Sequence, residues 1–368
     1  MNVVLRDGVI ASIGPTASAD VPPDAPALNC QGLVVVAGLH NSHVHFMEPK
    51  WAGAATLRAA ALNAQLRAML TRFGFTTVFD IGSRLDDTLA LRTRIETLEL
   101  KGPRILTAGE PLFPPDGLPI YLRGLPPELL KLMKEPATPQ AAVAAVDSNL
   151  ARGADAIKLF TESIMGEGKV KPMPDTIAAA AVAEAHRLQR PVFAHPSNVE
   201  GATIAISSGV DVLAHTNSEG WTPALVAAML AHHTALIPTL KLWSYEAARE
   251  GVTARQSDPL TDSAMDELSL FVRGGGEVLF GTDVGYMGDY DPTDEYALMA
   301  RAGMTPMQIL ASLTTLPSQR FQPTLRLGRV IPGAIADVTV LAADPAVDVR
   351  AFAQVRYTIR DGRVIYAR

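Results

Sequence analysis

The sequence predicts an α/β fold in which a (β/α)8 TIM barrel carries a small β-sandwich domain formed from both chain termini. Two observations lead to this prediction. Short apolar segments typical of buried parallel strands alternate with helical stretches along residues 33–324, and segments with hairpin chemistry lie near both ends of the chain. Eight strand–helix units are typical of a barrel whose functional site lies at the carboxyl ends of its strands.

The expected barrel strands are short and rich in Val, Ile, Leu and Phe. They cover residues 33–40, 76–80, 104–109, 155–160, 191–195, 211–215, 235–239 and 277–283. Helical stretches such as TPQAAVAAVDSNLARG separate them, with apolar residues spaced near the period of an α-helix. Nearly continuous apolar strands are expected where helices cover both faces of a parallel sheet.

Hairpin signals lie near the two ends of the chain. Asp7-Gly8 stands between two apolar runs, and Asp361-Gly362 repeats the pattern. Such dipeptides favour two-residue β-hairpin turns. The predicted domains are a discontinuous β domain of residues 1–32 and 325–368, and a barrel of residues 33–324.

Composition excludes several classes of protein. The net charge of −6 and the pI near 5.8 argue against a nucleic-acid surface. The single cysteine, Cys30, excludes an internal disulfide and fits a reducing compartment. Arg6 and Asp7 interrupt the first apolar stretch, so we expect no signal peptide there, and no apolar run has the length of a membrane span. We therefore expect a cytoplasmic protein that binds neither nucleic acid nor membrane.

Two histidines in the segment HNSHVHFMEPKW lie where the first expected strand ends. His43 and His45 are two residues apart, so on a strand their side chains share one face. Imidazole is the commonest neutral metal ligand of proteins. Taken alone, the pair fits a metal site and two ordinary polar residues at a strand end about equally well.

Four further ligand-type residues lie at or near the carboxyl ends of other expected strands. His195 and His215 end the fifth and sixth strands, Asp283 ends the eighth, and Lys158 lies near the end of the fourth. Because the ends of barrel strands meet at one face, we expect these side chains to converge. This convergence favours a metal site over the alternative that His43 and His45 are ordinary polar residues at a strand end.

Lys158 is the most informative of these residues. A charged lysine in an apolar strand is costly unless it is paired, for example with Asp155 or Glu162. A desolvated lysine can instead become neutral and react with carbon dioxide, giving a carbamate that bridges two metal ions. The predicted ligands are then His43, His45, Asp283 and the carbamate for one ion, and His195, His215 and the carbamate for the other.

The order of these residues resembles the binuclear metal-dependent amidohydrolase superfamily. The resemblance extends over essentially the whole chain, because FGFTTVFDIGS is similar to that group's second strand, GMTPMQILASLTTLPSQRF to its last helix and GRVIPGAIADVTVLAADP to its return into the β domain. GTDVG and TTVFD resemble most closely the imidazolonepropionase-like and Xaa-Pro dipeptidase-like branch. One position differs: the family usually has an aspartate two residues before its first metal histidine, where this chain has Asn41.

This ligand set predicts hydrolysis of a small molecule at an amide bond. Two divalent ions, with zinc the first expectation and manganese, cobalt or iron as alternatives, would hold a bridging hydroxide. Asp283 is the predicted catalytic residue, which accepts the proton of the hydroxide and returns it to the leaving group. Suitable substrates would be dipeptides or N-acyl amino acids.

Candidate substrate-binding residues follow the later strands or lie in a long Pro-rich connection. They are Arg123, Lys241, Trp243 and Tyr286. Arg123 or Lys241 could bind a substrate carboxylate, although both also fit ordinary surface charges. The run GEGKVK (166–171) lacks the spacing of a phosphate-binding loop and is better interpreted as a mobile lid.

Other functions remain open on the same scaffold. A lactonase would use the same metal centre, whereas a deaminase of this superfamily typically lacks the bridging lysine, so Lys158 argues against it. A non-catalytic binding barrel would have no use for a costly buried lysine and aspartate. Barrels of this kind are often dimers or larger, and a homo-oligomer is a further expectation.

Overall fold

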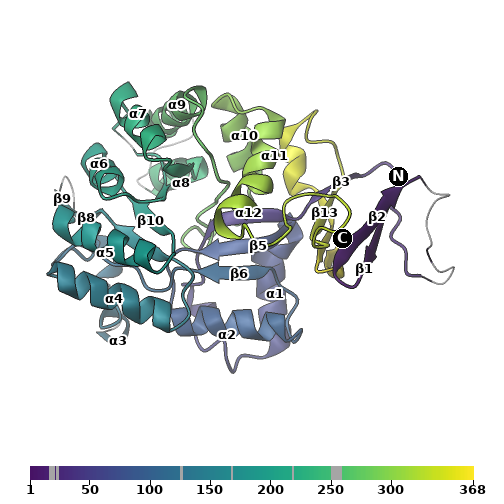
Figure 1. The fold of residues 1–368 in the computed structure, drawn as a ribbon, viewed down its shortest axis with the longest axis horizontal. Coiled ribbons are helices and arrows are strands. Elements are labelled where there is room, and N and C mark those ends of the chain that lie inside the picture. Colours follow the sequence, from purple (N-terminus) through teal and green to yellow (C-terminus); the bar gives the residue numbers. More distant parts are fainter. Residues whose placement is uncertain (16–20, 22–24, 125–126, 167–168, 218, 250–258) are drawn as a thin grey trace.

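Parallel strands lie at the centre of the larger part of the molecule, and most helices lie outside them (Figure 1). The computed structural model describes residues 1–15, 21, 25–124, 127–166, 169–217, 219–249 and 259–368. One parallel sheet has the order β4-β5-β6, and the other has the order β12-β11-β10-β7. Their strands are β4 (Leu39–Val44), β5 (Phe75–Asp80), β6 (Arg104–Thr107), β7 (Ile157–Phe160), β10 (Val192–His195), β11 (Val212–Ala214) and β12 (Ala235–Ile237).

The expected first strand, residues 33–40, is divided in two. β3 (Val34–Ala37) pairs with β13 (Val338–Leu341) near the chain ends, whereas β4 pairs with β5. Gly38 separates them, and a Cβ at this position would lie 2.2 Å from Oγ1 of Thr76. Only a glycine leaves room for the Thr76 side chain this close to the backbone. His43 lies within the second of the two strands, β4.

The expected eighth strand, residues 277–283, is not a regular strand in the described structure. A single parallel bridge links Val278 to Leu236 of β12, and on the other side the backbone N–H of Ser42 in β4 donates to the carbonyl of Phe280 over 2.7 Å. This segment therefore lies between the last and first strands. The mixed α/β fold is confirmed, whereas closure of the strands into one barrel stays a prediction.

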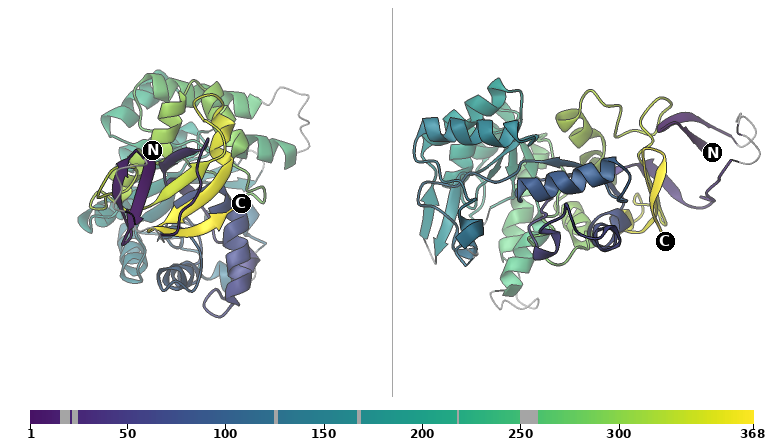
Figure 2. Two further views of the ribbon diagram at one scale, coloured as in Figure 1. Left: turned by 90° about the vertical axis from the view of Figure 1, so that its right-hand side faces the viewer. Right: turned by 90° about the horizontal axis from the view of Figure 1, so that it is seen from below.

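The two ends of the chain form antiparallel sheets at one end of the molecule, where both termini lie (Figure 2). The strands are β1 (Asn2–Arg6), β2 (Val9–Gly14), β3, β13, β14 (Val355–Arg360) and β15 (Arg363–Ala367). Ile10 of the β1–β2 hairpin shares a hydrophobic cluster with Val338 and Ile359 of the four-stranded sheet. The two-layer sandwich and the domain division stay predictions.

Both hairpin turns predicted from the sequence are present. Asp7 and Gly8 join β1 to β2 with φ of 52° and 76°, and Asp361 and Gly362 join β14 to β15 with φ of 48° and 74°. Positive φ at both central residues is the geometry that Asp-Gly favours in a two-residue hairpin.

Several helices begin where the sequence offers a capping side chain. Thr138, Asn198, Thr222 and Thr305 each accept a hydrogen bond from a backbone N–H in the first turn of α4, α6, α7 and α11. No helix among the described residues is both long and apolar enough to cross a bilayer. The α-helices are α1 (Ala59–Met69), α2 (Leu85–Glu96), α3 (Pro127–Leu130), α4 (Pro139–Ala151), α5 (Asp175–Arg187), α6 (Val199–Ser207), α7 (Pro223–Ala231), α8 (Leu240–Arg249), α9 (Pro259–Arg273), α10 (Thr293–Arg301), α11 (Pro306–Leu313) and α12 (Thr315–Phe321). The 3₁₀ helices are η1 (Pro49–Trp51), η2 (Thr71–Phe73), η3 (Ile120–Leu122) and η4 (Val349–Ala353).

Candidate metal centre

Three side chains predicted to bind one metal ion converge at the ends of their strands. Nε2 of His43 lies 3.1 Å from Oδ1 of Asp283, and Nε2 of His45 lies 2.9 Å from the same oxygen. The two Nε2 atoms are 3.2 Å apart. Ligand atoms bonded at about 2.0 Å to one tetrahedral ion lie about 3.3 Å from one another. The cluster therefore has the dimensions of a metal site.

The hydrogen bonding of His45 shows why a cation fits there. Nδ1–H of His45 donates to the carbonyl oxygen of Gly82 over 2.8 Å. In the neutral imidazole, Nε2 then carries a lone pair that faces a carboxylate oxygen of Asp283 at 2.9 Å. Two acceptors this close repel unless a cation or a proton lies between them. A divalent ion would satisfy both atoms.

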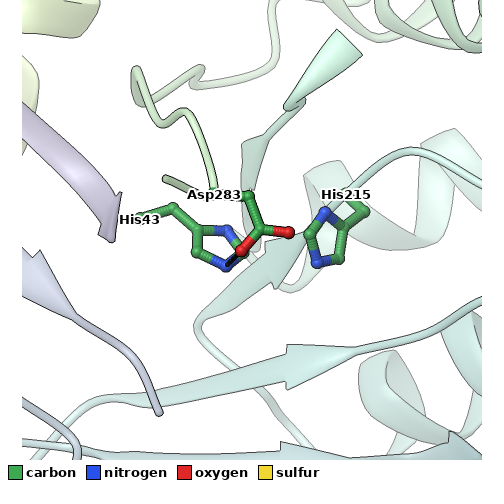
Figure 3. Close-up of side chains that lie close together, drawn as sticks. All are labelled: His43, His215 and Asp283. Atoms are coloured by element: carbon green, nitrogen blue, oxygen red, sulfur yellow. Dashed lines mark ion pairs between the residues drawn. The ribbon is translucent and has the colours of Figure 1, made fainter. Parts of the chain in front are cut away.

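His215 lies close to this cluster and comes from another strand end. Ligand atoms of His43, His215 and Asp283 all lie within 4.8 Å of one another, and all three side chains are buried. Figure 3 shows these side chains pointing toward one another. His43 lies in β4, His215 directly follows β11, and Asp283 ends the expected eighth strand, residues 277–283. The structure therefore brings together predicted ligands from well-separated parts of the sequence.

The remaining predicted ligands lie beside this cluster. The rings of His195 and His215 are 4.8 Å apart and nearly perpendicular, at 76°. Lys158 in β7 is 2% exposed, and both it and His195 line the same cavity as His43 and Asp283. All six residues predicted as metal ligands therefore meet at one cavity.

Two strained backbone positions aim ligands into the centre. His215 and Asp283 have φ of 76° and 57°, in the left-handed region that residues with a Cβ rarely adopt. Thr239, at the end of the seventh strand, has φ of 45°. Such strain persists where the surrounding structure enforces it, and it is concentrated at functional sites.

Thr239 also sets the tautomer of His215. Its hydroxyl donates to the carbonyl of Pro238 over 2.8 Å, so it accepts from Nδ1–H of His215 over 2.6 Å. The lone pair of His215 then lies on Nε2, the atom left for a metal. Sequence reasoning missed Thr239, because its position after an apolar strand carries no signal of this contact.

The close packing of the eighth segment against β4 depends on glycine. Gly285 has φ of +100°, and a Cβ there would lie 1.9 Å from the carbonyl oxygen of His45. A Cβ at Gly281 would lie 2.6 Å from Cβ of His43. The glycines of the motif GTDVG therefore let Asp283 approach both histidines.

Burial keeps most of these groups in the protonation state that a metal requires. Burial lowers the pKa of His43 to about 4 and holds the pKa of His215 well below its ordinary value. Burial also lowers the pKa of Lys158 to about 7. For Asp283, burial by itself raises the pKa, and the adjacent His43 and His45 reverse this, so its pKa lies well below the usual range. Neutral imidazoles, a readily neutralised amine and a carboxylate suit metal binding.

Asn41, the position that differs from the resembled family, links two elements of the site. Its Oδ1 accepts from the backbone N–H of His43 over 3.2 Å, and its Nδ2 donates to Oγ1 of Thr282 over 2.7 Å. Thr282 precedes Asp283 in the chain. The amide thus connects β4 to the segment that carries the aspartate, although it touches no predicted ligand atom.

The centre opens into a cavity of about 880 Å³, within the range of small-molecule sites. Trp243 and Tyr286, two of the predicted substrate-binding residues, line this cavity. The indole N–H of Trp243 donates to Oγ1 of Thr216, and the hydroxyl of Tyr286 donates to Glu246. These contacts hold both aromatic rings in the wall.

The two predicted carboxylate anchors lie elsewhere. Lys241 Nζ donates to Oδ2 of Asp289 over 2.7 Å, behind the cavity wall. Arg123 Nε donates to the carbonyl of Leu118, and its exposed side chain is not part of the lining. The position of Lys241 follows from its place at the start of α8, where the buried carboxylate of Glu295 accepts its backbone N–H.

The predicted lid is a β-hairpin. β8 (Glu162–Gly166) and β9 (Lys169–Pro172) pair in antiparallel fashion, and residues 167–168 of the run GEGKVK lie outside the described residues. Ile164 of β8 and Val170 of β9 reach the cavity lining. The hairpin therefore forms one wall of the cavity mouth.

Comparison with known proteins is consistent with this site. Residues 34–365 match the amidohydrolase family. An uncharacterized protein of Mycobacterium tuberculosis (strain ATCC 25618 / H37Rv) is 30% identical over 256 residues, which are 66% of this chain and 64% of that protein. The chain thus spans less than two thirds of the length of this curated relative.

Solved structures are similar over almost the entire chain. A protein from Bifidobacterium longum described as a prolidase has a TM-score of 0.81 and 25% identity, covering 99% of this chain and 89% of that one. A Xaa-Pro dipeptidase with bound methionine has a TM-score of 0.81 and 22% identity, covering 100% and 94%. These structures share the fold of this chain. The family match over residues 34–365 shows that the chain belongs to the amidohydrolase family.

Proposed function

We propose that this protein is a metal-dependent hydrolase that cleaves the amide bond of a small molecule. The observation that carries the proposal is the contact of His43, His45 and Asp283, in which acceptor atoms 2.9–3.2 Å apart face a cavity of about 880 Å³. The family match supports hydrolysis at carbon–nitrogen bonds. Dipeptides and N-acyl amino acids are the substrate classes that the sequence predicts.

Six residues are proposed to hold two divalent ions, with zinc as the first expectation. His43, His45 and Asp283 would bind one ion, His195 and His215 the other, and a carbamate on Lys158 would bind both. The burial of Lys158 and the resulting fall of its pKa to about 7 support the carbamate, because only the neutral amine reacts with carbon dioxide.

Each residue has a proposed part in the reaction. Bound divalent ions would supply Lewis acidity toward the substrate carbonyl and lower the pKa of water. Asp283 would accept the proton of the attacking water and return it to the departing nitrogen. Gly82 and Thr239 would keep His45 and His215 in the tautomers that leave Nε2 free.

The barrel and the assembly complete the proposal. Closure of the eight strands is supported by the hydrogen bonds of residues 277–284 to both β12 and β4, for example from Ser42 N–H to the carbonyl of Phe280 over 2.7 Å. A closed barrel would hold the ligands of different strands at fixed distances. The protein is further proposed to be cytoplasmic and to act as a homo-oligomer.

The test combines metal analysis with a hydrolysis screen. Two ions per chain, and release of both acid and amine from amides or dipeptides, are the expected results. One ion per chain with release of ammonia would identify a deaminase, and activity limited to lactones would identify a lactonase. If the wild-type protein binds no metal and hydrolyses none of the substrates, the proposal is contradicted. Asp283→Asn should lose this hydrolysis, and His232→Asn, which changes an exposed histidine, is its control.

A further inference from the structure

The cavity offers little positive charge to a substrate. Among the described residues that line it, the cations outside the metal centre are Arg84 and Lys169. Arg84 is 46% exposed in its side chain, with Nη1 3.5 Å from Oδ2 of Asp87, and Lys169 is an exposed residue of the β8–β9 hairpin. Both therefore lie toward solvent, whereas Lys241 and Arg123 are outside the lining.

The carboxylates of the lining are already engaged by the protein. Glu110 pairs with Arg152 over 2.9 Å, and Glu246 pairs with Arg249 over 3.0 Å. Asp87 accepts from the backbone N–H groups of Gly53 and Ala54, in the turn after η1, in addition to facing Arg84. Glu48 pairs with Lys50 over 2.7 Å, and Glu219 accepts from the backbone N–H of Val199. The described residues of the lining therefore include more carboxylates than cations outside the metal centre, which opposes the binding of a substrate carboxylate.

Apolar side chains form the wall next to the metal centre. Phe160 stacks on the ring of His195 with centroids 4.4 Å apart, and Phe113 packs on Phe160 at 4.6 Å. Trp243 lines the same cavity. A substrate carboxylate one carbon from the scissile nitrogen would have to leave water against these rings, which is costly without a partner.

The mouth of the cavity is apolar as well. Five lining residues, two of them on the β8–β9 hairpin, are large hydrophobic side chains with 37–43% of their surface exposed, namely Met47, Tyr121, Leu132, Ile164 and Val170. Clustered exposed apolar side chains around a concave site are typical of a surface that contacts a ligand. Their continuity with the walls of the metal centre indicates that one ligand covers both.

We infer that the substrate is a neutral amide with an apolar, aromatic-sized group on each side of the scissile bond and no carboxylate beside it. This inference rests on the amide hydrolysis of the proposed function, and it replaces the substrate classes that the sequence predicts, because dipeptides and N-acyl amino acids carry a carboxylate beside the scissile nitrogen. In the reaction, the oxygen of water bonds to the carbonyl carbon, the C–N bond breaks, and the nitrogen leaves as a neutral amine after receiving a proton. The acid and the amine are the products.

A matched pair of substrates tests the inference in the metal-loaded protein. N-benzoylphenethylamine and N-benzoyl-L-phenylalanine differ only by the carboxylate next to the scissile nitrogen. Because desolvation of an unpaired carboxylate opposes binding, kcat/KM should be at least about tenfold higher for the neutral amide. Equal or higher kcat/KM for the carboxylate substrate would overturn the inference.

Binding separates this inference from the proposed function. Ketones in which a methylene replaces the amide nitrogen of each substrate cannot be hydrolysed, and their Kd values can be measured by calorimetry. The neutral ketone should bind at least about tenfold more tightly. If neither amide is hydrolysed but this order of Kd holds, amide hydrolysis fails, whereas the preference of the cavity for an apolar ligand without a carboxylate stands. Tighter binding of the carboxylate ketone refutes it.

Variants of residues at the cavity mouth test whether the apolar side chains there contact the ligand. The double change Ile164→Ser and Val170→Ser should raise the Kd of the neutral ketone by about tenfold, since apolar contact area is lost. Val347→Ser, which alters a residue 87% exposed and outside the lining, is the control and should leave the Kd unchanged. An unchanged Kd of the neutral ketone in the double variant would contradict the inference. So would a rise in Kd in Arg84→Ala or Lys169→Ala that is seen only for the carboxylate ketone.

Discussion

The two halves of the candidate metal centre are built in different ways. In the first half, His43, His45 and Asp283 touch one another directly at 2.9–3.2 Å. In the second half, the ring centroids of His195 and His215 are 4.8 Å apart, compared with 5.1 Å for His43 and His45, and each ring also contacts a side chain outside the ligand set. Thr239 holds His215, and Phe160 stacks on His195.

This difference has a physical cause in the chain. His43 lies near the end of β4 and His45 directly follows this strand, two residues on, and glycines let Asp283 approach both. The ligands of the second half come from different strands, and the carbamate on Lys158 is proposed to link them to the first half. The first half is therefore set by local geometry, and the second by its surroundings.

The largest effect is expected in the first half. Asp283→Asn removes the proposed proton acceptor and the negative charge that faces both histidines, so kcat should fall by about 10⁴-fold. Steady-state kinetics with the best amide from the screen would measure it. Activity within tenfold of the wild type would show that another group takes the proton.

The second half is tested by removing its bridging group. Lys158→Met keeps the volume of this buried side chain and removes the amine, so metal content should fall from two ions to one per chain and kcat by at least about 100-fold. Elemental analysis measures the first change. Incorporation of ¹³C-labelled carbon dioxide, followed by NMR, should give a carbamate signal only in the wild type. Lys131→Met, at an exposed lysine, is the control.

The metal-free protein should lose stability in acid because of its buried imidazoles. Burial lowers the pKa of His43 to about 4, below its ordinary value of 6.5. The unfolded chain therefore binds the proton first as the pH falls, and the stabilising contribution, complete above pH 6.5, is lost between pH 6.5 and about 4.

The expected size of this loss is about 3 kcal/mol for His43. Urea unfolding of the metal-free protein at several pH values would measure it, and the dependence on pH should be smaller in His43→Asn. His232→Asn serves as the control, and it should retain the full dependence. If the free energy of unfolding depends on pH equally in His43→Asn and in the wild type, His43 has its ordinary pKa in the folded protein.

The smallest effect concerns the support of the second half. Thr239→Val removes the hydroxyl that accepts from Nδ1–H of His215, so the affinity for the second ion should fall by about tenfold. Competition with a chelator would measure this affinity. Thr203→Val, at an exposed position of α6, should not change it. An unchanged affinity in Thr239→Val would mean that the neighbouring strands alone orient His215.

Much of the candidate site could be predicted from the sequence. The six proposed ligands lie where strand ends were expected, because apolar runs of a parallel sheet are easily recognised and polar residues after them are conspicuous. Both Asp-Gly turns were predicted for a similarly local reason, since a two-residue hairpin demands positive φ. Lys158 stood out because a lysine is costly in such a strand.

The remaining features depend on contacts between distant segments. The division of residues 33–40 at Gly38 follows from the approach of Thr76, and the irregular course of residues 277–283 follows from hydrogen bonds to two different strands. No local pattern reports either contact. For the same reason, the sequence could not show that Lys241 faces Asp289 rather than the cavity.

The sequence by itself determined the alternation of strands and helices, the turns near the chain ends and the residue types of the metal centre, since these depend on local periodicity and on chemistry that a single residue carries. Only the tertiary structure decided which side chains touch, which tautomers the histidines adopt and which charges reach the cavity. Those outcomes depend on packing between residues far apart in the chain, such as Asn41 with Thr282 and Lys241 with Asp289.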